Sequence, residues 1–125
     1  ASDVYKRQYP EYEQEVKVPE KVWPLRIWYM YDQDVCTLID VNERERKVKI
    51  KNYTDKIMFR AFGVMEEPDY NQYIEFLESR CFPESRDKMK LILKDLGLPF
   101  YDPIMIIEKT EGRMAEDDFW IRIER

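Results

Sequence analysis

The chain has 125 residues, of which 44% are hydrophobic and 14% aromatic, so it suits one folded domain rather than a disordered chain. It carries 26 acidic and 21 basic residues, a net charge of −5, and no histidine. The lack of histidine excludes serine–histidine and cysteine–histidine nucleophile systems. Two cysteines alone cannot supply a usual zinc site. Composition leaves carboxylate–magnesium and lysine chemistry open.

The two cysteines, Cys36 and Cys81, lie far apart in the sequence and match no metal-ligand spacing. We expect both to be reduced, buried or half-buried thiols of an intracellular protein. No apolar run approaches the ~20 residues that a membrane-spanning helix needs, and no signal peptide is recognisable. The expected location is therefore the cytoplasm, without membrane association and without a cofactor.

The beginning of the chain differs from the rest. Residues 2–8 resemble the adapter-derived translation found at the start of metagenomic open reading frames, so we leave residues 1–8 out of the fold prediction. Residues 9–24 are polar and contain three prolines and four glutamates. They predict an extended acidic arm, residues 1–24, which carries Val16 and Val18 into an edge strand.

The next forty residues predict strands. Segments rich in aromatic and β-branched residues or with alternating polarity are separated by short polar turns. The predicted strands cover residues 25–31, 35–41, 47–53 and 56–62. An antiparallel four-stranded meander is the natural arrangement for strands joined in this way.

After Gly63 the apolar spacing becomes helical. A first helix is predicted with Pro68 in its first turn and an apolar stripe at Tyr70, Tyr73, Ile74 and Leu77. Residues 84–96 predict a second helix that Gly97 caps. Asp102 and Pro103 predict the N-cap and first turn of a third, which runs to residue 109. Residues 119–124 predict a final strand, so residues 25–125 form a single α+β domain.

Charge is divided unevenly between the two halves of the chain. Residues 64–125 carry nine basic and fifteen acidic side chains, whereas residues 1–63 are close to neutral. An acidic surface opposes nonspecific attraction to phosphate backbones. Direct binding of nucleic acid is therefore not expected.

The densest acidic cluster is Glu116, Asp117 and Asp118, beside Trp120. Three carboxylates in a row suggest a magnesium site or a partner-binding patch. Neighbouring strand residues point to opposite faces, however, which favours a solvated turn over a metal site. Asp32 and Asp34 likewise suit a turn better than a cation site.

The basic cluster consists of Arg44, Arg46, Lys47, Lys49 and Lys51. Alternation places the three lysines on one strand face, where they are candidate phosphate contacts. A solvated sheet face, or protection of an edge strand against aggregation, is the simpler interpretation. The many tyrosines and tryptophans similarly suit a core, with stacking platforms or interface anchors as alternatives.

One resemblance rests on three short motifs at positions 80–83 (Arg-Cys-Phe-Pro), 101–103 (Tyr-Asp-Pro) and 117–120 (Asp-Asp-Phe-Trp). Over about residues 79–121 the chain resembles small uncharacterised accessory proteins of gut Firmicutes and their phages, some of them associated with HipA-type kinase toxin loci. The resemblance implies an accessory gene in a bacterial host cell. Similar proteins often have a histidine where this chain has Glu111. No catalytic residue follows from the resemblance.

We therefore expect a non-catalytic protein from a phage or mobile element that binds and modulates another protein. The most specific version of this expectation is an anti-CRISPR-like inhibitor, whose acidic surface occupies the nucleic-acid channel of a defence nuclease. The alternative is an antitoxin-like or regulatory partner of a HipA-type kinase toxin. An enzyme is not expected, and exposed strand edges leave a homodimer open. The candidate partner-binding residues are Glu75, Glu78, Glu111, Glu116, Asp117, Asp118 and Trp120.

Overall fold

The computed structural model of the chain describes residues 4–6 and 15–125. The order of elements confirms the α+β class. The strands are β1 (Val4–Lys6), β2 (Glu15–Lys17), β3 (Leu25–Tyr31), β4 (Asp34–Asn42), β5 (Lys47–Asn52) and β6 (Phe119–Glu124). The helices are the 3-10 turn η2 (Ile57–Phe59), α1 (Tyr70–Ser79), α2 (Met89–Leu96) and α3 (Pro103–Thr110).

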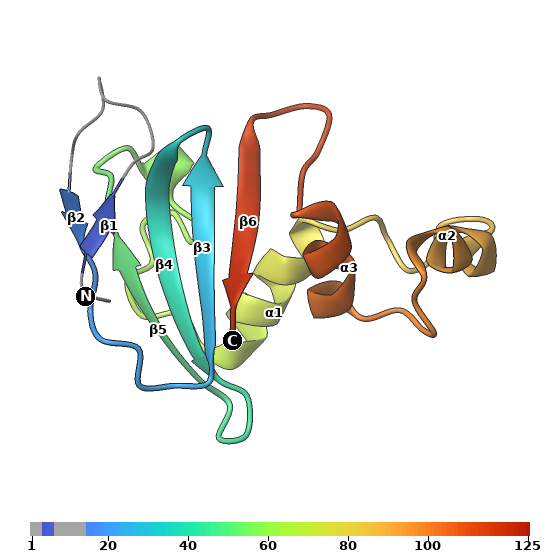
Figure 1. Cartoon of the computed structure of the whole chain (residues 1–125), viewed down its shortest axis with the longest axis horizontal. Helices are drawn as coiled ribbons and strands as arrows, with labels where there is room; N and C mark the ends of the chain where they lie inside the picture. Colours follow the sequence, from blue (N-terminus) through green and yellow to red (C-terminus); the bar gives the residue numbers. More distant parts are fainter. Residues whose placement is uncertain (1–3, 7–14) are drawn as a thin grey trace.

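The main sheet is antiparallel, with the strand order β5-β4-β3-β6 (Figure 1). β3 lies in the middle, where Ile27 is opposite Ile39 of β4 on one side and Ile123 of β6 on the other. The C-terminal strand thus pairs with the first strand of the sheet, although the paired residues lie 88 to 98 positions apart in sequence. This pairing closes the domain.

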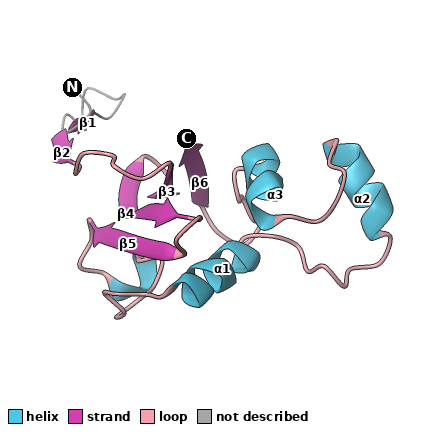
Figure 2. Ribbon diagram, turned by 90° about the horizontal axis from the view of Figure 1, so that it is seen from below, coloured by secondary structure: helices cyan, strands magenta, loops and turns pink. Residues whose placement is uncertain are grey.

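Different elements cover the two faces of the sheet. α1 lies on one side of the sheet, and the β1–β2 hairpin lies on the other (Figure 2). The side chains of Ile27, Ile39 and Ile121 point to the α1 side and pack with Tyr73 and Leu77 in the larger core. Since these side chains are nearly inaccessible to solvent, this core supplies most of the hydrophobic stabilisation.

The opposite face holds a smaller core around Trp28, Met30 and Leu38, which Val18 helps to cover. A buried arginine, Arg26, lies beside it with only 1% of its surface exposed. Its guanidinium donates to both carboxylate oxygens of Asp40, at 2.7 and 3.1 Å, and to the Pro19 carbonyl at 2.8 Å. The segment before β3 is therefore fixed over this face by a paired charge rather than by apolar contact alone.

One predicted strand is wrong. Residues 56–62 form η2 and a series of turns, in which Arg60 N–H donates to the Ile57 carbonyl and Gly63 N–H donates to the Arg60 carbonyl. Phe59 points into the larger core, whereas Ile57 and Met58 are exposed. The fourth place in the sheet is taken by β6 beside β3.

Two predicted helix starts also differ from the structure. Asp69 caps α1 by accepting from Gln72 N–H, while Gln72 accepts from Asp69 N–H, so Pro68 precedes the cap instead of lying in the first turn. α2 begins at Met89 rather than at residue 84, because Lys88 has a left-handed backbone with φ of 62°. The caps predicted at Gly97, Asp102 and Pro103 are confirmed.

The N-terminal region forms a separate small sheet instead of an edge strand. In it Val4 pairs with Lys17 and Tyr5 pairs with Val16. Val18 follows this hairpin and is buried in the smaller core. Strand β1 lies within residues 1–8, which the sequence analysis set aside.

Candidate functional site

The predicted acidic patch at Glu116, Asp117 and Asp118 lies in the loop between α3 and β6. Its central carboxylate is bound inside the protein: Arg80 donates to the two carboxylate oxygens of Asp117 at 3.0 and 3.1 Å. Arg80 also donates to the carbonyls of Gly112 and Phe119, and it is 7% exposed. These hydrogen bonds hold the pKa of Asp117 below its ordinary value. Asp117 therefore fastens the loop to α1.

The other residues of this loop are more accessible. Glu116 and Asp118 are exposed, and Glu111 accepts from the guanidinium of Arg113 at 2.8 Å. Trp120 donates from its indole nitrogen to the Asp32 carbonyl at 2.8 Å. A hollow of about 210 Å³ lies between this loop and the β3–β4 turn. Two carboxylates of this loop, Glu116 and Asp118, are exposed and form no ion pair with any described residue.

Glu75 and Glu78 lie on the outer side of α1, three residues apart and therefore on one helix face. Trp120 belongs to the sheet face that packs with Trp28, whereas α1 covers the opposite face through Tyr73 and Leu77. Of the seven residues predicted to bind a partner, Trp120 therefore lies on the sheet face opposite the one that α1 covers. The seven residues divide into an α1 group and a loop group.

The α1 group continues into a region that the sequence analysis did not select. Between Gly63 and Arg80 the chain has five acidic residues and no basic one. Asp69 is the helix cap, while Glu66 and Glu67 are exposed in the loop before it. Within the described part of the chain none of Glu66, Glu67, Glu75 and Glu78 forms an ion pair. We call these four residues the α1 acidic surface.

The predicted basic cluster lies in β5 and the turn before it. Lys47, Lys49 and Lys51 are exposed and share the sheet face that lies opposite α1. Lys49 lies over the ring of Trp23 at 4.7 Å and Lys51 over Tyr53 at 5.2 Å. Arg46 lies over Tyr70, and Arg44 is exposed in the turn. Several of these cations therefore cover aromatic rings, as at many protein surfaces.

Exposed apolar side chains gather within the segment 56–62, which was predicted to be a strand, and directly after Gly63. Ile57, Met58, Val64 and Met65 are 49%, 82%, 74% and 37% exposed. The Ile57 side chain lies within van der Waals distance of the position that a Gly63 Cβ would occupy, so both ends of this segment meet. We call these four residues the turn patch. A residue-by-residue apolar pattern could not reveal it, because the same pattern suits a buried strand.

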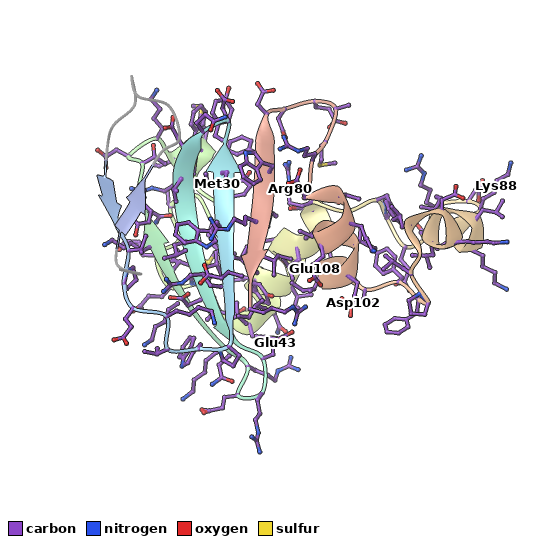
Figure 3. All side chains as sticks on the ribbon, in the orientation of Figure 1. Met30, Glu43, Arg80, Lys88, Asp102 and Glu108 are labelled. Atoms are coloured by element: carbon purple, nitrogen blue, oxygen red, sulfur yellow. The ribbon has the colours of Figure 1, made fainter. Side chains whose placement is uncertain are left out.

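α2 projects from the body of the protein (Figures 1 and 2). Figure 3 places Lys88 at the outer end of this projection, far from Arg80. Leu93 and Leu98 are buried, but Leu91 and Phe100 are 57% and 56% exposed. An open groove of about 580 Å³ runs along the helix, lined by Lys90, Leu93, Lys94, Gly97, Leu98 and Pro99. We call it the α2 groove.

Both cysteine thiols are buried. Burial raises the pKa of the Cys36 thiol to about 11 and that of the Cys81 thiol to about 12. In residues 4–6 and 15–125 no three Cys, Asp or Glu side chains gather where they could hold a metal ion. The described helices include none that is long and apolar enough to cross a membrane.

Comparison with known proteins gives no match to any protein-family model, curated protein or solved structure.

Proposed function

We propose that this protein is a non-catalytic modulator that binds another protein through the α1 acidic surface. The observation that carries the proposal is the set of four exposed glutamates at positions 66, 67, 75 and 78. None of them has a cation within ion-pair distance in the described residues. Carboxylates that have no internal partner retain their full attraction for a basic surface.

Such an acidic surface fits a basic site on its partner, of the kind that binds phosphate backbones. An acidic protein surface competes there by complementary charge, which also accelerates association. A defence nuclease presents this chemistry in its nucleic-acid channel, so an anti-CRISPR-like inhibitor is the form of the proposal that the charges favour. Glu75 and Glu78 are its central residues, because a helix packed on the core holds them in fixed positions.

The alternative partner is a HipA-type kinase toxin. The exposed apolar side chains of Leu91 and Phe100 favour a contact of this kind, in which affinity comes from burial of apolar surface. The salt dependence of binding distinguishes the two kinds of partner. Ionic strength screens a charged contact between exposed groups strongly and an apolar contact hardly at all.

The experiment uses the full chain immobilised on a sensor, with guide-free CRISPR effector nucleases and a HipA-type kinase as probes. We expect binding of a nuclease that weakens steeply between about 50 and 500 mM salt. Glu75→Lys/Glu78→Lys should weaken it at least about tenfold, because like charges then face each other. Glu116→Lys/Asp118→Lys is the matched control with the same change in net charge.

Binding of the kinase alone, insensitive to salt and to Glu75→Lys/Glu78→Lys, would replace the inhibitor with the regulatory partner. Absence of binding to either class at low salt would contradict the proposed function.

A further inference from the structure

The exposed large apolar side chains of the described residues are concentrated in two places. Of the seven that are at least about one third exposed, four form the turn patch and two, Leu91 and Phe100, flank the α2 groove; the seventh is Val22. Scattered apolar residues on a surface need no explanation, but clusters of them mark interaction sites. The two clusters lie apart, since α2 projects from the sheet body while η2 lies beside the sheet (Figures 1 and 2).

The two clusters carry opposite charge at their borders. Glu66 and Glu67 directly follow Met65 of the turn patch, and both are exposed without an ion pair among the described residues. Lys90 and Lys94 line the α2 groove and likewise have no ion pair there. The cations nearest in sequence to the turn patch have internal contacts, because Arg60 lies 4.0 Å from Asp55 and Lys56 covers Phe59.

Each cluster also has apolar side chains suited to a contact. Met58 is 82% exposed, and a flexible methionine fills irregular apolar hollows well. The α2 groove is open, and its lining includes Leu93, Leu98 and Pro99 beside Lys90 and Lys94. Its volume of about 580 Å³ is ample for several side chains.

α2 packs on the larger core through Met89, Leu93 and Leu96, but Lys90, Leu91 and Lys94 are exposed. It has eight residues, and helices shorter than about 12 residues are marginal in water unless tertiary packing supports them. Only Leu93 of this helix is buried. A contact that covers the α2 groove would therefore stabilise the helix as well as bury its apolar side chains.

We propose that the turn patch of one copy of this protein docks into the α2 groove of a second copy. Met58, Val64 and Met65 contact the apolar floor, and Glu66 and Glu67 pair with Lys90 and Lys94 of the other copy. Each copy uses two different surfaces, so the interface is heterologous and builds a ring or an open chain. This inference does not rest on the proposed function, although it uses Glu66 and Glu67, two of the four residues of the α1 acidic surface.

The contact is small, so the association is weak and transient. Sedimentation of the full chain at low salt should show a weight-average mass that rises above the monomer value at protein concentrations of about 100 μM. Addition of about 500 mM salt should return it to the monomer, because the pairs are exposed to solvent.

Charge reversal tests the pairing directly. Glu66→Lys/Glu67→Lys and Lys90→Glu/Lys94→Glu should each sediment as a monomer, since each variant presents like charges at the contact. An equimolar mixture of the two should associate again, and so should the variant that combines all four changes. Glu116→Lys/Asp118→Lys, which shifts net charge as Glu66→Lys/Glu67→Lys does, should associate like the unmodified chain. All these positions are exposed, and circular dichroism checks that each variant is folded.

A monomer at every concentration and salt would overturn the inference. Association that persists in both charge-reversed variants, or that the mixture fails to restore, would overturn it equally.

Discussion

Arg80 and Asp117 form a two-point ion pair, with nitrogen–oxygen distances of 3.0 and 3.1 Å, that fastens the loop between α3 and β6 to the end of α1. Arg80 follows the last residue of α1, and its guanidinium lies near the rings of Tyr29 and Phe119, at 5.9 and 6.0 Å from their centres. The pair positions the start of β6, since Asp117 also accepts from Phe119 N–H. A carboxylate that looked available for a partner is thus part of the fold.

Replacing Arg80 should destabilise the protein strongly. Arg80→Ala removes four hydrogen bonds, two to the Asp117 carboxylate and two to the carbonyls of Gly112 and Phe119, and leaves Asp117 with the Phe119 N–H alone. Loss of one member of a buried pair costs about 3–5 kcal/mol of unfolding free energy. Because Asp117 is partly exposed, we expect a loss of about 3 kcal/mol. Urea unfolding measures it, with exposed Arg86→Ala as control. Equal stability of the two variants would contradict the role of Arg80.

The same pair predicts a dependence on pH. Arg80 lowers the pKa of Asp117 in the folded protein, so the pair's contribution is complete above the ordinary aspartate pKa. It is lost as pH falls through the lowered value, where the folded carboxylate takes up a proton. The difference in unfolding free energy between the unmodified chain and Asp117→Asn should therefore be constant above about pH 5 and shrink below about pH 4. A difference that grows on acidification would refute this.

Much of the fold can be predicted from local patterns. Aromatic and β-branched residues predict the bounds of β3, and alternation predicts those of β6. The caps follow from the Asp102 carboxylate, which accepts a helix N–H, and from Gly97, which tolerates a left-handed backbone. Segment 56–62 shows the limit of such patterns, because Ile57, Met58 and Phe59 suit a strand or a turn equally. In the structure the sheet takes its fourth strand from residues 119–124, through the pairing of β6 with β3. That contact between distant residues leaves no trace in local composition.

The sequence shows which kind of side chain the candidate site uses, but not which of these side chains lie together. The excess of carboxylates in residues 64–125 can be counted directly. The sequence cannot show that Arg80 neutralises Asp117, since the two residues are 37 positions apart. Glu66 and Glu67 escape notice for the opposite reason: they stand in an unremarkable loop, and only the absence of a described cation beside them distinguishes them.

Two glycines with left-handed backbone should respond differently to alanine. Gly112 has φ of 62°, and a Cβ there would lie 3.1 Å from Ile121 Cδ1. Gly97 has φ of 74°, but a Cβ there meets no atom within 4 Å. Gly97→Ala should cost about 1 kcal/mol through backbone strain alone. Gly112→Ala should cost at least about 1 kcal/mol more, because it adds a clash in the core. Thermal unfolding of both variants measures their losses of stability. Equal losses would contradict the crowding at Gly112.

The two thiols should be inert in the native state. Burial raises the pKa values of Cys36 and Cys81 to about 11 and about 12, so neither forms an appreciable amount of thiolate at neutral pH. An aromatic disulfide reagent at pH 8 should react with neither thiol in the folded chain and with both in denaturant. Rapid reaction of a native thiol would show that its burial is not maintained in solution.

The central claim is that Glu75 and Glu78 occupy a basic site for which nucleic acid also competes. The most direct measurement is displacement of a fluorescent guide RNA from a CRISPR effector nuclease by increasing amounts of this protein at about 50 mM salt. We expect the unmodified chain and Glu116→Lys/Asp118→Lys to displace the RNA, whereas Glu75→Lys/Glu78→Lys should leave it bound. RNA that stays bound while the protein binds beside it, or displacement that is equal for all three chains, would contradict the proposed function.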